Sequence, residues 1–190
     1  QVQTGIWLET GGWLGGVKTD VFEVQRVAGQ VFSRYYTRDD KRAERGIAAS
    51  VRKLGKGQIA GAYFNIGEAY WKRRNHVMRD WLGSLVGQLF RAPLVEVKGS
   101  HWVDVTVNRL ADGRLAINLV NTSGPHGDED VYVFDEIASL GPLTVSVRLK
   151  KRPAKVTWEP EHRKLNFTYE RGKLVVELPR LAIHEIIVIE

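Results

Sequence analysis

The chain has 190 residues and a formal net charge of +6, and 43% of its residues are hydrophobic while 26% are charged. These values are typical of a folded globular chain rather than a disordered one, and the length allows one large domain or two small ones. The absence of cysteine excludes disulfides, thiolate zinc sites and a cysteine nucleophile.

The first half of the chain is predicted to contain a β-hairpin and one long helix. Residues 1–46 have weak periodicity, whereas residues 47–54 and 58–64 flank a Gly-Lys-Gly turn, which indicates a hairpin. From about Glu68 to Phe90, apolar residues recur at spacings of three, four and seven, which predicts a single helix with one apolar stripe.

This first half has too few elements to cover both faces of a sheet in an α/β domain. We therefore expect residues 1–93 to be the terminal part of a larger domain or to pack on a partner chain. The chain begins with Gln rather than Met, which agrees with that expectation.

The second half, residues 94–190, has the period-two pattern of β-strands separated by Gly, Pro and Asp signals. An Asp-Gly turn at residues 112–113 joins two alternating runs into a hairpin. The pattern as a whole predicts a small antiparallel β-sandwich. Its seven expected strands are 102–107, 115–120, 143–149, 155–158, 165–169, 174–178 and 183–189.

The polar run NLVNTSGPHGDED, residues 118–130, interrupts this strand pattern. His126 and Asp128, with the acids that follow, are candidates for a loop that reaches a neighbouring domain. A divalent cation bound through oxygen ligands is the alternative, but the D-x-D-x-D-G frame of an EF-hand is absent. We predict a connecting loop with no metal, in which Asn121 bonds to the backbone.

Six tryptophans in 190 residues is a high number, and sugar rings stack on exposed aromatic faces. Trp7, Trp13, Trp102 and Trp158 are candidates for such a platform, and Trp13 and Trp102 are our choices for carbohydrate-binding residues. The competing interpretation is that these rings lie in the core. Trp71 and Trp81 lie on or near the helix stripe and are expected to be core residues.

The remaining motifs carry little chemistry. Asn121 and Asn166 begin sequons, but no secretion signal supports glycosylation. The five histidines have no zinc-site spacing, and His184 is expected to make structural hydrogen bonds. There is no G-x-S-x-G elbow and no phosphate-binding loop, so the sequence predicts no catalytic residue and no cofactor.

Two stretches together resemble a known family. The segment LGKGQIA, residues 54–60, followed by a strand, a loop and a helix, resembles the end of the glutamine-amidotransferase-like, flavodoxin-like trimerisation domain of β-galactosidase-type glycoside hydrolases. The segments HWVDVTVNRLADGRLAINLVNTSGPHGD and LPRLAIHEIIVIE resemble the C-terminal β-sandwich of those enzymes. The resemblance covers about residues 46–190.

The resemblance implies a fold that is mainly β, with an incomplete flavodoxin-like α/β portion at residues 1–93 and a β-sandwich at residues 94–190. In that family two glutamates about 5 Å apart on a (β/α)8 barrel perform catalysis, and a barrel needs roughly 250 residues. This chain has no room for one. Its implied role is therefore non-catalytic: structural support of a glycoside hydrolase barrel and of oligomerisation.

The implied partners are the remainder of the same enzyme or a partner chain, a second copy of this chain, and carbohydrate. The alternative is a stand-alone carbohydrate-binding β-sandwich module. Nucleic acid is not expected, because basic clusters such as Lys72–Arg74 and Lys150–Arg152 are dispersed and accompany no recognition motif. No membrane segment or signal peptide is visible, and the lack of cysteine favours the cytoplasm.

Overall fold

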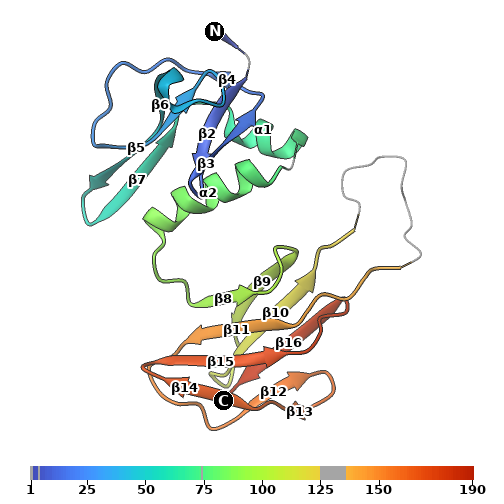
Figure 1. Cartoon of the computed structure of the whole chain (residues 1–190). Helices are drawn as coiled ribbons and strands as arrows, with labels where there is room; N and C mark the ends of the chain where they lie inside the picture. The colour runs from blue at the N-terminus through green and yellow to red at the C-terminus, as the bar shows by residue number, and fades with distance from the viewer. Residues whose placement is uncertain (1, 4, 74, 125–135) are drawn as a thin grey trace. The chain divides into compact units, whose positions relative to one another are not determined.

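A five-stranded antiparallel sheet is the centre of the first unit, residues 1–91, and two packed sheets form the second unit, residues 92–190 (Figure 1). The computed structural model describes residues 2–3, 5–73, 75–124 and 136–190. None of the helices within those ranges is long and apolar enough to cross a membrane.

The sheet of the first unit has the strand order β3-β2-β5-β6-β7. All of its strand pairs are antiparallel. The flavodoxin-like arrangement that the resemblance implied has parallel strands, so this part of the expectation is corrected. The elements are β1 (Val2–Gln3), β2 (Ile6–Thr10), β3 (Trp13–Val17), β4 (Asp20–Val21), β5 (Gln30–Tyr36), the 3-10 helix η1 (Lys41–Ala43), β6 (Glu44–Leu54), β7 (Gly57–Ala62), α1 (Ile66–Arg73) and α2 (His76–Leu89).

The predicted hairpin is present as β6 and β7, but the single predicted helix is wrong. Two helices are present instead, and Asn75 is the N-terminal cap of the second: its backbone is extended and its side chain accepts a backbone N–H of α2. The Asn75 Oδ1 accepts the Met78 N–H at 2.9 Å, which satisfies one of the unpaired donors at the start of α2. The apolar stripe continues across this break, so periodicity alone did not reveal it.

Helix α2 packs on the sheet through Val77, Met78, Trp81 and Leu85, all of them buried. Trp81 is 1% exposed and lies edge-on to two phenylalanine rings, with centroids 6.1 Å from Phe32 and 5.1 Å from Phe64. Its indole Nε1–H donates to the Ser33 Oγ at 3.0 Å, so the buried polar atom is paired.

The close approach of this helix depends on a glycine in β3. A Cβ at position 15 would lie 2.5 Å from a methyl carbon of Val77, which is too near for van der Waals contact. The first unit therefore has a core of its own, centred on Trp81. The weak periodicity of residues 1–46 did not predict it.

In the second unit the predicted antiparallel sandwich is confirmed. One sheet has the order β13-β12-β16-β10-β9 and the other β14-β15-β11-β8. The strands β8 and β13 were not predicted. The elements are β8 (Val95–Lys98), β9 (Val103–Arg109), β10 (Leu115–Asn121), β11 (Leu143–Arg148), β12 (Val156–Glu159), β13 (Arg163–Lys164), β14 (Phe167–Glu170), β15 (Lys173–Leu178) and β16 (His184–Ile189).

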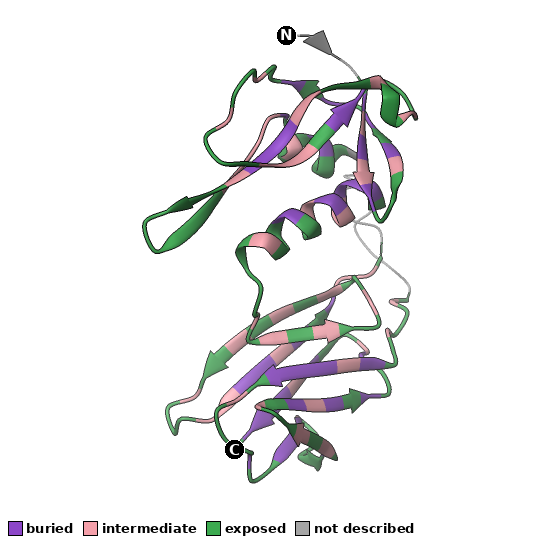
Figure 2. Ribbon diagram, turned by 60° about the vertical axis from the view of Figure 1, so that its left-hand side comes forward, coloured by how far each residue is buried: buried purple, intermediate pink, exposed green. Residues whose placement is uncertain are grey.

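An apolar layer fills the space between these two sheets. Alternate residues of β15, namely Leu174, Val176 and Leu178, are buried, and they pack with Ile117 of β10 and Ile187 of β16. Figure 2 shows this alternation as purple segments between pink and green ones along the strands. The strands β8, β9, β14 and β15 thus alternate between a more buried and a more exposed face, as the period-two pattern predicts, whereas β11, β12 and β16 contain runs of consecutive buried residues.

The buried Asn121 holds the end of β10. Its Nδ2 donates to the carbonyl oxygens of Ala138 and Ala182 at 2.9 and 2.7 Å, and its Oδ1 accepts the Ser123 N–H at 2.9 Å. The prediction that Asn121 bonds to the backbone is confirmed. His184 makes the expected structural contact, with its Nε2 lying 3.2 Å from the Asn118 Oδ1.

Removing Trp81 is expected to destabilise the first unit. The substitution Trp81→Ala would leave a cavity between Phe32 and Phe64 and cost about 3–5 kcal/mol of unfolding free energy. Urea denaturation followed by circular dichroism measures this. Phe22→Ala, at an exposed aromatic residue of the same unit, is the control and should change stability by less than about 0.5 kcal/mol. Equal effects of the two substitutions would contradict the central position of Trp81.

Asn121→Ala is expected to destabilise the second unit by about 1–3 kcal/mol, because two backbone carbonyls and one N–H lose their hydrogen-bond partner. Asn166→Ala is the matched control: Asn166 is exposed and should be nearly neutral. Thermal unfolding of both variants beside the parent chain is the measurement. A neutral Asn121→Ala would mean that these hydrogen bonds do not hold the loop.

Candidate functional site

Trp13 is a half-exposed ring held in a fixed position. It begins β3 and pairs with Thr10 across a turn in which Gly11 and Gly12 have positive φ. The ring is 44% exposed, and its centroid lies 5.4 Å from that of the His76 ring in a tilted stack. A fixed, accessible indole is suited to stacking on a sugar ring. The assignment of Trp13 to carbohydrate binding stays a prediction.

Trp102 lies in the second unit and is 50% exposed. It precedes β9, and its N–H donates to the Ser100 Oγ at 3.1 Å. Its carbonyl oxygen accepts two hydrogen bonds from Thr122, from the N–H at 2.8 Å and from the Oγ1 at 3.0 Å. The backbone of Trp102 is therefore well anchored, and its role as a sugar-stacking residue also stays a prediction.

Of the other tryptophans, Trp158 and Trp81 agree with the core interpretation, and Trp71 does not. Trp158 is 7% exposed, its Nε1–H donates to the Glu185 carboxylate, and the Arg163 guanidinium lies 4.6 Å from the centre of its ring. It is a core residue and not a platform. Trp7 is half-buried with its ring against Gly16. Trp81 lies in the core as expected, but Trp71 is an exposed side chain of α1.

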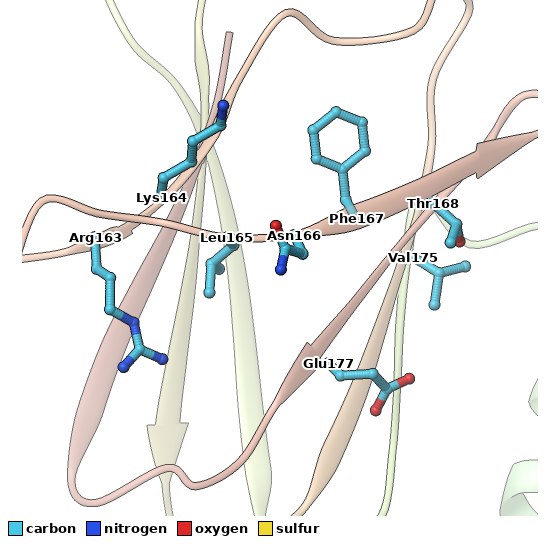
Figure 3. A pocket seen from close by; sticks show the side chains of 8 residues that line it. All are labelled: Arg163, Lys164, Leu165, Asn166, Phe167, Thr168, Val175 and Glu177. Atoms are coloured by element: carbon cyan, nitrogen blue, oxygen red, sulfur yellow. The ribbon is translucent and has the colours of Figure 1, made fainter.

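A cleft of about 630 Å³ opens beside β14 and β15 in the second unit (Figure 3). Its side chains include both hydrogen-bond donors and acceptors, which suits a ligand with many hydroxyl groups. Glu177 is its one carboxylate, and that group accepts a hydrogen bond from the Thr144 Oγ1 at 3.0 Å. The lining residues are Arg163, Lys164, Leu165, Asn166, Phe167, Thr168, Val175 and Glu177.

This cleft contains the second sequon, which consists of Asn166, Phe167 and Thr168. Asn166 and Thr168 are exposed, whereas Asn121 of the first sequon is buried with its Nδ2 already bonded. A glycan attached through Nδ2 would displace those bonds at Asn121. Of the two sequons, only that of Asn166 is sterically open.

The predicted interdomain contacts His126 and Asp128 lie outside the described residues. Within the described ranges, no three His, Asp or Glu side chains come close enough to hold a metal ion together. The described part of the polar run begins with Asn121 bonded to the backbone, as the loop interpretation predicted.

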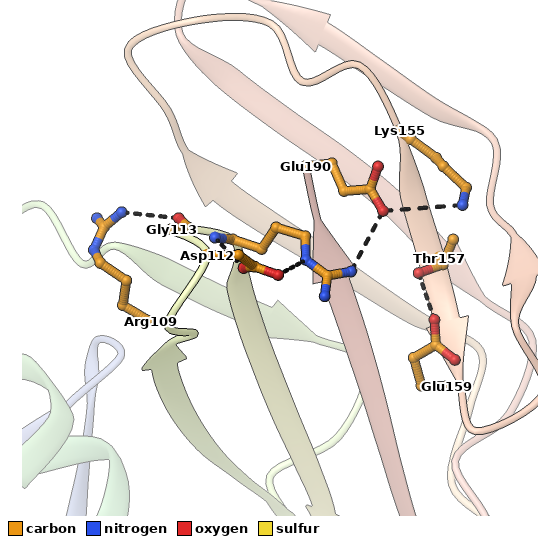
Figure 4. A network of polar contacts seen from close by, with 8 residues as sticks. Arg109, Asp112, Gly113, Lys155, Thr157, Glu159 and Glu190 are labelled. Atoms are coloured by element: carbon orange, nitrogen blue, oxygen red, sulfur yellow. Dashed lines mark hydrogen bonds and ion pairs between the residues drawn. The ribbon is translucent and has the colours of Figure 1, made fainter.

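The last residue of β12, Glu159, has a carboxylate with a hydroxyl on one side and a histidine ring on the other. The Glu159 Oε1 accepts a hydrogen bond from the Thr157 Oγ1 at 2.7 Å (Figure 4). Its Oε2 lies 2.5 Å from the His162 Nδ1. The Thr157 hydroxyl, and after it the charge of His162, hold the pKa of Glu159 below its usual value of 4.5.

A lowered pKa in the folded chain means that the unfolded chain binds more protons near pH 4.5. Glu159 therefore stabilises the fold above that pH, and the contribution is lost as the pH falls through the folded pKa. We expect the parent chain to lose more stability between about pH 5 and about pH 3 than Glu159→Gln does. Glu161→Gln, at the exposed neighbouring residue, is the control, and melting temperatures across this range are the measurement. Parallel curves for parent and Glu159→Gln would refute the assignment.

Comparison with known proteins finds similarity at the level of structure. No family model matches the chain, and no curated protein sequence matches it. Among solved structures, the chain is similar to Alpha-L-fucosidase isoenzyme 2 from Paenibacillus thiaminolyticus, with a TM-score of 0.68 and 14% sequence identity. The match covers 100% of this chain and 32% of that one, so the chain spans about a third of the fucosidase. At this identity the similarity shows a shared fold.

Proposed function

We propose that the chain is a non-catalytic accessory portion of a glycoside hydrolase, with a structural role beside the catalytic part. The observation that supports this most directly is the extent of the structural match. All of this chain, but only 32% of the α-L-fucosidase chain, takes part in it. The chain thus corresponds to a minor share of an enzyme whose remaining length is available for catalysis.

The chemistry of the described residues agrees with an accessory role. A retaining glycosidase needs two carboxyl groups about 5 Å apart, and an inverting one needs them roughly 6.5–9.5 Å apart across the scissile bond. The cleft beside β14 and β15 offers Glu177 alone.

The finer proposal is that the parent enzyme is of the β-galactosidase type and that the chain supports oligomer formation. It rests on the segments LVN, residues 119–121, and HEIIVIE, residues 184–190. These segments lie on adjacent antiparallel strands, with Leu119 opposite Glu185 and Val120 opposite His184. Leu119 and Ile187 are buried core residues, so the pattern that resembles the family is one that a sandwich core requires.

The second candidate is a stand-alone carbohydrate-binding module. The half-exposed rings of Trp13 and Trp102 favour it, because each is held by the surrounding backbone or by a neighbouring ring. The two candidates differ in whether a catalytic barrel accompanies the chain.

The purified chain is expected to show no hydrolysis of a panel of aryl α- and β-glycosides, including fucosides and galactosides. The encoding reading frame is expected to contain a barrel-length segment with two essential carboxylates. Deleting residues 1–190 from that enzyme should lower its melting temperature. The kcat of the protein that still folds should change little.

Hydrolysis by the isolated chain, abolished by Glu177→Gln, would overturn the accessory role. The binding module would be favoured instead by an encoding frame without a barrel, together with calorimetric binding of neutral oligosaccharides that Trp13→Ala or Trp102→Ala removes. Arg52→Gln, at an exposed residue of β6, is the control for these substitutions.

A further inference from the structure

A second and larger cleft, of about 1030 Å³, lies at one end of the sandwich. We call it the basic cleft. It is formed where β9 turns into β10, where β11 ends, and where β16 ends, so both sheets contribute to it. Its lining residues are Leu94, Arg109, Asp112, Gly113, Arg114, Leu115, Arg148, Leu149, Lys150, Lys151, Arg152, Pro153, Ile189 and Glu190.

Six of these side chains are basic and two are acidic. Both acids are bound to the same arginine: the Arg114 Nε lies 2.8 Å from the Asp112 Oδ2, and its Nη1 lies 3.5 Å from the Glu190 Oε1. Lys155, just outside the cleft, lies 3.9 Å from the same oxygen of Glu190 (Figure 4). The negative charge of the cleft is therefore already compensated, and the other five basic side chains give a positive excess.

Two of those five are arginines held by neutral acceptors. The Arg109 Nη1 donates to the Gly113 carbonyl at 3.1 Å, and the Arg148 Nε donates to the Pro93 carbonyl at 3.2 Å. A carbonyl orients a guanidinium without cancelling its charge, so the remaining N–H groups of each fork can bind an anion. Because each guanidinium is already held in place, it loses less conformational entropy when a ligand binds than a freely rotating arginine side chain would.

The loop from Lys150 to Arg152 supplies the remaining three charges. Lys150 and Lys151 are exposed and form no ion pair with any of the described residues. Arg152 lies with its guanidinium carbon 5.2 Å from the centre of the Phe167 ring, a contact that leaves its charge uncompensated.

The floor of the basic cleft is apolar. Leu94, which is 44% exposed, lies with Leu115, Leu149, Pro153 and Ile189 among the lining residues. None of the lining side chains is aromatic, so the cleft has no surface on which nucleic-acid bases would stack. A ligand that fits combines anionic groups with saturated C–H faces.

We propose that the basic cleft binds an anionic oligosaccharide, with the carboxylate or sulfate groups of the sugar paired to Arg109 and Arg148. The choice of a sugar as the carrier of the anion rests on the proposed function. The basic cleft shares no lining residue with the cleft of Glu177, although Arg152 of the first lies over the Phe167 ring of the second.

The test is isothermal titration of the whole chain with three oligosaccharides of equal length: an oligogalacturonate, a sulfated oligosaccharide and a neutral oligogalactose. We expect binding of at least one anionic ligand and at least tenfold weaker binding of the neutral one. Affinity should fall as sodium chloride increases, because the contacts are ionic. The two anionic ligands separate a uronate-binding site from a sulfate-binding one.

The variant that removes the site is Arg109→Gln with Arg148→Gln, and we expect it to weaken binding at least tenfold. Arg52→Gln with Arg180→Gln is the matched control: it removes the same charge from exposed arginines outside the cleft and should bind as the parent does. Arg109→Lys with Arg148→Lys keeps the charge but loses the planar fork, and should be intermediate. Thermal unfolding of each variant verifies that it folds.

Three results would overturn the proposal: equal affinity for neutral and anionic sugars, an equal loss in the matched control, or no binding at low salt. Equal or tighter binding of a single-stranded oligonucleotide would assign the cleft to nucleic acid instead. Failure here is distinguishable from failure of the accessory role, because hydrolysis by the isolated chain is a separate readout that this titration does not affect.

Discussion

The packing of two sheets through one apolar layer fixes the positions of the functional groups in the second unit. Because side chains alternate along a strand, a shift of one residue in β10 would move Ile117 and Leu119 from the core to solvent. The pairing of β10 with β9 on one side and β16 on the other leaves one register that buries both residues. The same register places Arg109 opposite Leu115, and Leu115 opposite Ile189, and all three line the basic cleft.

The first unit depends on a different constraint, the closeness of α2 to β3. Gly15 allows that closeness, and Trp81 fills the space behind it. The surface that results is uneven: Trp13 is held half-exposed beside His76, while Trp81 is enclosed between phenylalanine rings. Tryptophan thus has two roles at α2: Trp13 presents an exposed ring beside the first residue of the helix, and Trp81 packs in the core at its middle.

Sequence periodicity predicted the sandwich because its strands bury alternate residues, and strands such as 115–120 and 174–178 were placed within one or two residues. It missed β3 and β5, where glycines and bulges break the alternation, and it also missed β2, whose five residues alternate but are too few to stand out. It also merged α1 and α2, because the apolar stripe continues past the cap at Asn75. Hydrophobic periodicity therefore predicts the position of a regular helix or strand well, but it does not reveal the caps and bulges that interrupt one.

The sites were harder to predict because they are made by residues distant in sequence. Lys150–Arg152 is visible as a cluster in the chain, but its proximity to Arg109 follows only from sheet pairing. The sequence does not distinguish Trp158 from Trp13 and Trp102. In the structure, the Glu185 carboxylate bonded to its Nε1–H and the Arg163 guanidinium over its ring identify it as a core residue.

The position of the basic cleft at the ends of strands has a consequence for sequence change in this fold. Arg109, Arg148 and the Lys150–Arg152 loop are exposed, whereas the apolar layer uses the middle of each strand. Charge at this end can therefore be exchanged by single substitutions that leave the core intact. Chains that keep the same scaffold are therefore free to differ in charge at this end of the sandwich, and a shared fold at 14% identity does not fix which residues stand there.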